Sequence, residues 1–300
     1  MNYTERFQLI DAQGRTLTLE YPYALDTING VNLPSTKDRT TRSPFQAGDT
    51  YLGAMTEPRV IDITLVVKGR TRGELGQMRR HLASRVNAKA TPLQFRALLE
   101  DGARFRLRNV SCIGPIQGAI SYEGDALAQK LGLRLVAHDT IWYSDELHTV
   151  TLEAGETEQL TFPVTLGPGG NLFFGAYAVT GLVDLHNQGD WDAAPFIRIP
   201  VPVDNPKIIN QTTHETIALQ YSVSAGEIVY IDTTPGARRV YNNYGVDLKK
   251  YLLGGDFATF HLEPDSIVAP NGHNFLVLLG ATPGILIQGS VSWYDRFTSI

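Results

Sequence analysis

One pair of carboxylates in the chain has a spacing that suggests catalysis. Asp190 and Asp192 flank Trp191, which resembles an acid/base pair beside an aromatic platform for a sugar ring, as in a glycoside hydrolase. The same Gly-Asp-Trp-Asp segment is typical of a surface turn, where such carboxylates are solvated. We favour the surface turn and keep glycan hydrolysis by Asp190 and Asp192 as a minor hypothesis.

Other catalytic and metal-binding signatures are missing from the sequence. It has no Gly-x-Ser-x-Gly and no P-loop, and the His214-Glu215 pair lacks the second histidine of a zinc protease. The seven histidines show no ligand spacing, and the single cysteine, Cys112, lies in a strand-like segment that favours a buried small hydrophobe over a nucleophile. We therefore predict no enzymatic activity, no metal site and no cofactor.

Three arginines alternate along one predicted strand. Arg104, Arg106 and Arg108 share one face of the segment, and Phe105 and Leu107 share the other. A solvated or intersubunit face is the favoured interpretation, and a surface facing passing nucleic acid is the alternative. Aromatic side chains are not interleaved on the basic face, which argues against a stacking platform for single strands.

A long polar stretch, residues 34–58, shows little periodicity. A loop of that length is uncommon inside a compact domain and is usually functional or disordered. It could be an arm that orders against a neighbouring subunit, with Arg39, Arg42, Phe45 and Tyr51 as its candidate contacts.

Length and composition fit a globular protein. The 300 residues predict two domains, each able to bury a core, and 43% hydrophobic with 19% charged residues fits a soluble chain. No apolar run approaches the roughly 20 residues of a membrane helix. The N-terminal segment is polar and lacks an apolar signal core, so we expect no membrane span and synthesis in a reducing cytoplasm.

The charge changes sign near residue 145. Residues 1–145 carry 19 Lys and Arg against 15 Asp and Glu, whereas residues 146–300 carry 7 against 16. The two segments therefore look like separate units, and we place a domain boundary between 145 and 146.

Periodicity predicts a mainly β fold with one α-helix. The helix is expected at about 72–88, with Thr71 and Glu74 as a capping box and an apolar stripe that includes Leu75 and Leu82. Residues 1–145 otherwise read as strands of a β-sandwich or barrel-like domain. Residues 146–300 read as eight to ten short strands, including those at 159–162 and 257–262, of a β-sandwich or jelly roll.

Five short motifs, each weak alone, follow one another along the chain. They are HDTIWY at 138–143, NQG at 187–189 with APFI at 194–197, NPKIINQTT at 205–213, GEIVYIDT at 226–233 and VSWYDRF at 291–297. In this order they resemble the distal tail protein family of long-tailed siphophages, also described as the siphovirus tail-component family. Thr140 stands where the family has proline, and Leu262-Glu263-Pro264 is separated from Gly272-His273-Asn274, which the family joins.

The resemblance implies a structural virion protein, the distal tail or baseplate hub. It implies a homo-oligomeric ring, expected to be a hexamer, built by the N-terminal domain, and a galectin-like C-terminal jelly roll that projects outward. Its implied partners are the tail tube protein, a tail-tip hub, tail-associated lysin or fibre protein, and a receptor-binding protein. DNA would pass through without sequence-specific binding. Arg104, Arg106 and Arg108 would face the lumen or a neighbouring protomer.

A second class of function stays open at this point. A jelly-roll domain with exposed aromatic residues could be a carbohydrate-binding adhesin that contacts the host cell wall. Its candidate contacts are Trp191, Tyr241 and Tyr244, although packing in the core or at its rim is favoured for each.

Overall fold

The computed structural model describes residues 5–118, 127–156, 178–180, 182–280 and 287–300. The chain divides into two compact units. The first comprises Met1–Asp145 together with Phe297–Ile300, and the second comprises Glu146–Arg296. The last four residues thus belong to the first unit, whereas the sequence placed them in the second.

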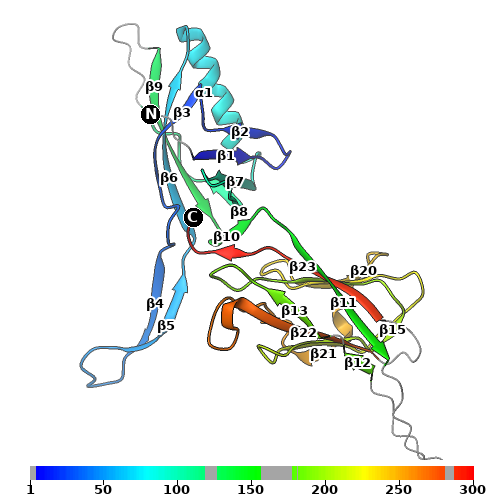
Figure 1. The fold of residues 1–300 in the computed structure, drawn as a ribbon. Coiled ribbons are helices and arrows are strands. Elements are labelled where there is room, and N and C mark those ends of the chain that lie inside the picture. Colours follow the sequence, from blue (N-terminus) through cyan, green and yellow to red (C-terminus); the bar gives the residue numbers. More distant parts are fainter. Residues whose placement is uncertain (1–4, 119–126, 157–177, 181, 281–286) are drawn as a thin grey trace, which may run out of the picture. The chain divides into compact units, whose positions relative to one another are not determined.

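The first unit is built around a nine-stranded sheet and one α-helix (Figure 1). The sheet has the order β2-β1-β7-β8-β9-β6-β3; β10 also pairs with β8, and β24 pairs with β10. The strands of this sheet and the helix are β1 (Arg6–Ile10), β2 (Thr16–Thr18), β3 (Tyr23–Asn29), β6 (Arg59–Lys68), α1 (Arg72–Val86), β7 (Leu93–Leu98), β8 (Arg104–Cys112), β9 (Ala128–Ala137), β10 (Trp142–Ser144) and β24 (Arg296–Phe297).

Alternating burial along the strands forms the core of this unit. Along β6, Ile61, Ile63 and Leu65 point inward and are buried, because every second side chain of a strand lies on the same face. The predicted helix is confirmed as α1, and the hydroxyl of Thr71 accepts a hydrogen bond from the Glu74 backbone N–H at 3.1 Å. Leu75 lies on the face of α1 that packs into this core.

A buried arginine anchors distant segments of the first unit. Arg59, at the start of β6, is 1% exposed. Its guanidinium donates hydrogen bonds to five backbone carbonyls of the described residues, those of Gly30, Val31, Asn32, Thr140 and Thr298. Burial lowers the pKa of its guanidinium to about 10. The side chain therefore ties the end of β3, the segment before β10 and the C-terminus to one strand.

Residues 34–58 contain a β-hairpin in place of the expected irregular loop. Among the described strands, β4 (Thr36–Thr41) and β5 (Thr50–Thr56) pair only with each other, with a register shift between Arg39 and Thr40. Sequence periodicity missed the strands because both of their faces are exposed and no apolar alternation marks them. In Figure 1 the hairpin extends away from the sheet of its unit.

The second unit contains two larger sheets that share one apolar core. The first has the order β12-β11-β23-β14-β19-β20, the second has the order β13-β22-β16-β17-β21, and β15 and β18 form a separate pair. The strands are β11 (His148–Glu156), β12 (Ala178–Thr180), β13 (Leu182–His186), β14 (Phe196–Ile199), β15 (Val203–Asp204), β16 (Lys207–Asn210), β17 (Thr216–Leu219), β18 (Ser222–Val223), β19 (Val229–Asp232), β20 (Arg239–Asn242), β21 (Leu252–Gly255), β22 (His273–Leu279) and β23 (Ile287–Trp293), with short 3-10 helices at η1 (Lys249–Tyr251) and η2 (Pro270–Gly272).

The mainly β fold with a single α-helix is confirmed for the described residues. Two of the predicted strands are not found there. The expected strand at 257–262 is a turn, with only an isolated bridge between Leu262 and Ala193. The expected strand at 159–162 lies outside the described residues. No helix in the described part of the chain is long and apolar enough to cross a membrane.

Candidate functional site

The basic strand face of the first unit is partly neutralised within the unit. Arg106 forms an ion pair with Asp145 at 3.6 Å, and Arg96 of β7 reaches the other oxygen of the same carboxylate at 3.2 Å. The guanidinium carbon of Arg108 lies 4.2 Å from the ring centre of Tyr143. Arg104 is exposed. The three arginines alternate along β8 as expected, and Arg104 is the member of the row with an exposed side chain.

The β4–β5 hairpin presents large apolar side chains to solvent. Phe45 at its tip is fully exposed, and Tyr51, Leu52 and Met55 of β5 are each more than half exposed. Two cations share the hairpin: Arg39 is exposed in β4, and Arg42 lies 3.9 Å from Asp49 across the tip. The candidate arm residues are therefore gathered on one projecting element with no core of its own.

The three aromatic residues named as glycan contacts lie in different settings. Tyr241 in β20 stacks on Tyr230 of β19, with ring centres 5.1 Å apart. Tyr244 lies in the turn after β20 and is 69% exposed. Trp191 is half-buried, and its backbone N–H donates to the Arg296 carbonyl at 3.2 Å. Among the described residues, the Trp191 ring forms no aromatic contact with either tyrosine, so a shared platform for a sugar ring gains no support.

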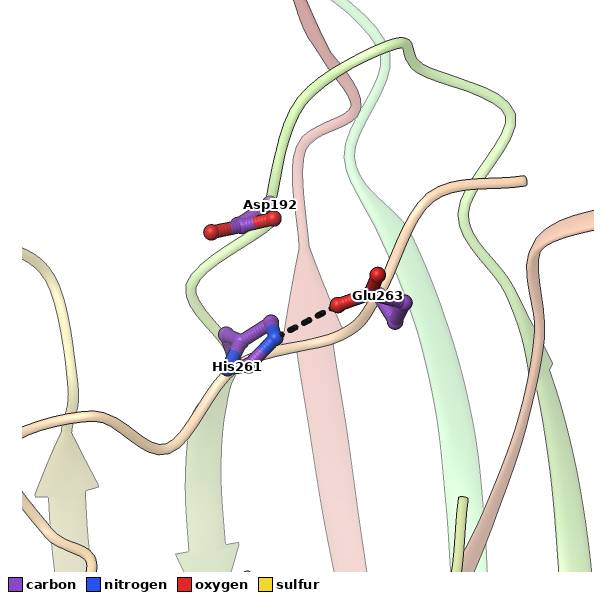
Figure 2. Close-up of side chains that lie close together, drawn as sticks. All are labelled: Asp192, His261 and Glu263. Atoms are coloured by element: carbon purple, nitrogen blue, oxygen red, sulfur yellow. Dashed lines mark hydrogen bonds and ion pairs between the residues drawn. The ribbon is translucent and has the colours of Figure 1, made fainter. Parts of the chain in front are cut away.

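The Asp192 side chain lies close to two side chains that the sequence patterns did not place beside it (Figure 2). Its carboxylate, the His261 imidazole and the Glu263 carboxylate have ligand-type atoms within 4.8 Å of one another. His261 Nε2 lies 2.8 Å from Glu263 Oε2, and His261 Nδ1 lies 3.0 Å from Glu215 Oε2. Asp190 is not part of this cluster, so the acid pair suggested by the sequence is replaced by a different group of side chains.

The pKa of two groups in this cluster is shifted. Burial raises the pKa of the Asp192 carboxyl, His261 opposes the rise and Glu263 adds to it. Burial lowers the pKa of His261, but the hydrogen bonds to Glu263 and to the Thr259 carbonyl, with the charge of Glu215, outweigh burial and raise it. The cluster therefore favours positive charge at its centre.

The sequence contained a weak signal for this cluster. His261 and Glu263 are two positions apart in an extended segment, a spacing that places both side chains on one face. Their approach to Asp192 depends on the pairing of Ala193 with Leu262, nearly seventy positions away, which no local pattern encodes.

Comparisons with known proteins identify the family. Residues 12–106 match the family model described as the phage tail protein RIFT-related domain. Residues 188–274 match the model described as the siphovirus-type tail component, C-terminal domain. The two matches fall in different structural units of the chain. A comparison with curated protein sequences found no match.

Solved structures share the fold at low sequence identity. The Dit protein (gp 19.1) of phage SPP1, described as a paradigm of the hub adsorption apparatus in phages that infect Gram-positive bacteria, aligns with a TM-score of 0.63 and 13% identity over 97% of this chain and 99% of that one. A chain of the phage P2 baseplate in its activated conformation with Ca aligns with a TM-score of 0.54 and 9% identity over 99% of both chains. With a family model matched in each unit, the chain belongs to the distal tail protein family of siphophages, the structural components of the phage tail and baseplate.

Proposed function

We propose that this chain is the ring-forming hub at the distal end of a siphophage tail. Six copies assemble through the first unit around a channel through which DNA passes without sequence-specific contacts. The ring joins the tail tube protein to the tail-tip hub, lysin or fibre protein and to the receptor-binding protein. The chain is made in the host cytoplasm, acts in the virion and has no enzymatic role.

The exposed β4–β5 hairpin is the observation that carries the ring proposal. An isolated two-stranded hairpin is marginally stable in water, and this one exposes Phe45, Tyr51, Leu52 and Met55. Apolar side chains gathered on a projecting element mark an interaction site. In a cyclic oligomer each arm would cover a neighbouring copy, and the chain of contacts would close on itself.

The arginine row supplies a second, weaker argument. Arg106 and Arg108 already interact with Asp145 and Tyr143 and are partly buried, whereas Arg104 is the exposed arginine of this row. We therefore assign Arg104 to the lumen or the subunit interface and give Arg106 and Arg108 a structural role.

Native mass spectrometry of the full chain tests the arm. The wild-type chain is expected as a hexamer, and the double variant Phe45→Ala/Tyr51→Ala is expected to shift toward monomer. Tyr244→Ala removes an aromatic ring that is about as exposed as that of Tyr51, but from the second unit, and should leave the hexamer intact. Hexamers that are equally abundant in the arm variant would exclude the arm as the main contact.

The carbohydrate-binding adhesin is the second hypothesis. It is favoured by the exposed ring of Tyr244 close in sequence to Tyr241, whose ring faces the Arg239 guanidinium at 4.9 Å. Titration of the full chain with host-wall polysaccharide tests it, with Tyr244→Ala and Trp191→Ala as probes. Saturable binding that Tyr244→Ala abolishes would support the adhesin hypothesis, and the absence of binding by the wild type would exclude this hypothesis.

A further inference from the structure

We propose that Asp192, His261 and Glu263 form a binding site for a divalent transition-metal ion in the second unit. The three side chains converge in Figure 2 from two segments that are distant in sequence. Asp192 lies between β13 and β14, and the other two lie between β21 and η2. A bound ion would connect these two segments. The proposal does not depend on ring formation.

Backbone pairing explains why the three side chains meet. The Ala193 N–H donates to the Leu262 carbonyl at 3.0 Å, and the Leu262 N–H donates to the Ala193 carbonyl at 2.8 Å. Ala193 and Leu262 are both fully buried. The residues next to a bridged pair point to the opposite face of the backbone. Asp192, His261 and Glu263 are such neighbours, and their side chains therefore emerge together on the outer side.

The imidazole is held in the orientation that a metal ligand needs. His261 Nδ1 lies 2.8 Å from the Thr259 carbonyl and 3.0 Å from Glu215 Oε2, which are both acceptors, so Nδ1 carries a hydrogen. Metal-binding histidines commonly donate their second ring N–H to a carbonyl or carboxylate in this way. Nε2 lies 2.8 Å from the Glu263 carboxylate, and a metal cation that displaces the proton shared by these two groups can bind Nε2 and the carboxylates together.

Negative charge exceeds positive charge at this position. Asp192, Glu215 and Glu263 surround one imidazole. The guanidinium of Arg296 is the nearby cation, and its Nη1 donates to the Asp192 backbone carbonyl at 3.0 Å. A divalent ion would balance the carboxylates while the imidazole stays neutral, which is the form that binds metals.

Three buried asparagines fix the backbone that carries the ligands. The amide nitrogen of Asn187 donates to the carbonyls of Trp191 and Leu262, and that of Asn210 donates to the His261 carbonyl at 2.9 Å. Asn274 accepts from the Glu263 N–H and donates to the Glu263 carbonyl. All three asparagines are at most 1% exposed. The site is therefore organised before any ion arrives, which reduces the entropy cost of binding.

The donor set selects the class of metal. One imidazole nitrogen and two carboxylates suit Zn²⁺, which takes N and O ligands and leaves a fourth position for water or a group from another molecule. Ca²⁺ and Mg²⁺ prefer oxygen ligands throughout. We therefore expect Zn²⁺ to bind more tightly than either.

Isothermal titration of the metal-stripped full chain with ZnCl₂ tests the proposal. The wild type should bind one ion per chain, and Asp192→Asn and Glu263→Gln should each weaken binding by at least about tenfold. His273→Gln is the matched control, because it removes an imidazole that pairs with Asp184 at 2.9 Å and stacks on the His186 ring, outside the cluster of Asp192, His261 and Glu263. Its affinity should equal that of the wild type.

Three results would overturn the assignment. They are no saturable Zn²⁺ binding by the wild type, binding that Asp192→Asn and Glu263→Gln leave unchanged, and binding that is tighter for Ca²⁺ than for Zn²⁺. Circular dichroism of each variant establishes that it is folded before it is titrated. In thermal melts, Zn²⁺ should raise the Tm of the wild type and of His273→Gln, because an ion that binds the native state stabilises that state. Zn²⁺ should not raise the Tm of Glu263→Gln.

Discussion

Phe297 packs edge to face against Phe105, with ring centres 5.2 Å apart. The two residues lie near the end of the chain and in β8, so the chain returns to its first unit after completing the second. The Thr298 carbonyl, one residue further, accepts a hydrogen bond from Arg59 at 2.7 Å. The C-terminal segment is therefore a structural part of the first unit.

Removal of the Phe297 ring should destabilise the first unit. Phe297→Ala loses the aromatic contact and part of an apolar cluster. We expect the free energy of unfolding to fall by about 2 kcal/mol, which is less than the cost of truncating a fully buried phenylalanine, because Phe297 is only partly buried. Chemical denaturation followed by tryptophan fluorescence measures the change. Phe45→Ala, which removes a fully exposed ring, is the control and should leave unfolding of the monomer unchanged.

Arg59 should be intolerant of substitution. Arg59→Ala removes the donor to the buried Thr140 carbonyl and to the partly buried carbonyls of Gly30 and Thr298. A buried unsatisfied carbonyl costs about 1–3 kcal/mol, so we expect a loss of several kcal/mol in total. Arg59→Lys keeps the charge but has one nitrogen in place of a fork, and it should recover only a small part of the loss. Denaturant titration measures both variants. A lysine variant as stable as the wild type would show that the guanidinium geometry is unimportant.

Asp145 should stabilise the first unit through the two arginines that share it. Asp145→Asn removes the charge between Arg96 and Arg106, whose ion-paired side chains are mostly buried, and we expect a loss of about 1–3 kcal/mol. The matched control is Asp62→Asn, which breaks an exposed pair with Arg134 and should have little effect. Equal effects of the two substitutions on the denaturation midpoint would contradict this role.

Acid should destabilise the second unit through Glu227. Burial alone would raise the pKa of this carboxyl, but hydrogen bonds from Tyr221 at 2.6 Å, from Asn242 at 2.7 Å and from the Ser224 N–H outweigh burial and lower it. Because the folded-state pKa lies below the unfolded one, the stabilisation is present above the unfolded value of about 4.3 and is lost as pH falls through the folded value.

Glu227→Gln provides the comparison for that pH dependence. Unfolding measured between pH 7 and pH 3 should show a smaller loss of stability on acidification in the variant than in the wild type, because the titrating group is gone. Glu57→Gln is the control, since Glu57 is an exposed carboxylate in the other unit. Parallel pH profiles for the wild type and Glu227→Gln would mean that other groups cause the acid sensitivity.

Local patterns in the sequence predict the parts of this fold that bury one face. The alternation of Ile61, Ile63 and Leu65 and the spacing of Leu75 and Leu82 indicate a strand and a helix because burial selects their period. The β4–β5 hairpin carries no such signal, since the described part of the chain covers neither of its faces.

Long-range pairing limits what the sequence can predict about the sites. The acceptors of Arg59 come from segments as distant as Gly30 and Thr298, and Asp192 reaches His261 only through the Ala193–Leu262 bridge. The Asp190–Asp192 spacing therefore suggested a catalytic pair, whereas the fold gives Asp192 a different set of neighbours.

Electron microscopy of the full chain at high concentration tests the central claim most directly. The ring proposal predicts class averages with a closed six-fold ring and a central opening, lost when Phe45 and Tyr51 are both replaced by alanine. Particles that remain monomeric at every concentration, or that form open filaments or rings of another symmetry, would contradict the proposed hub.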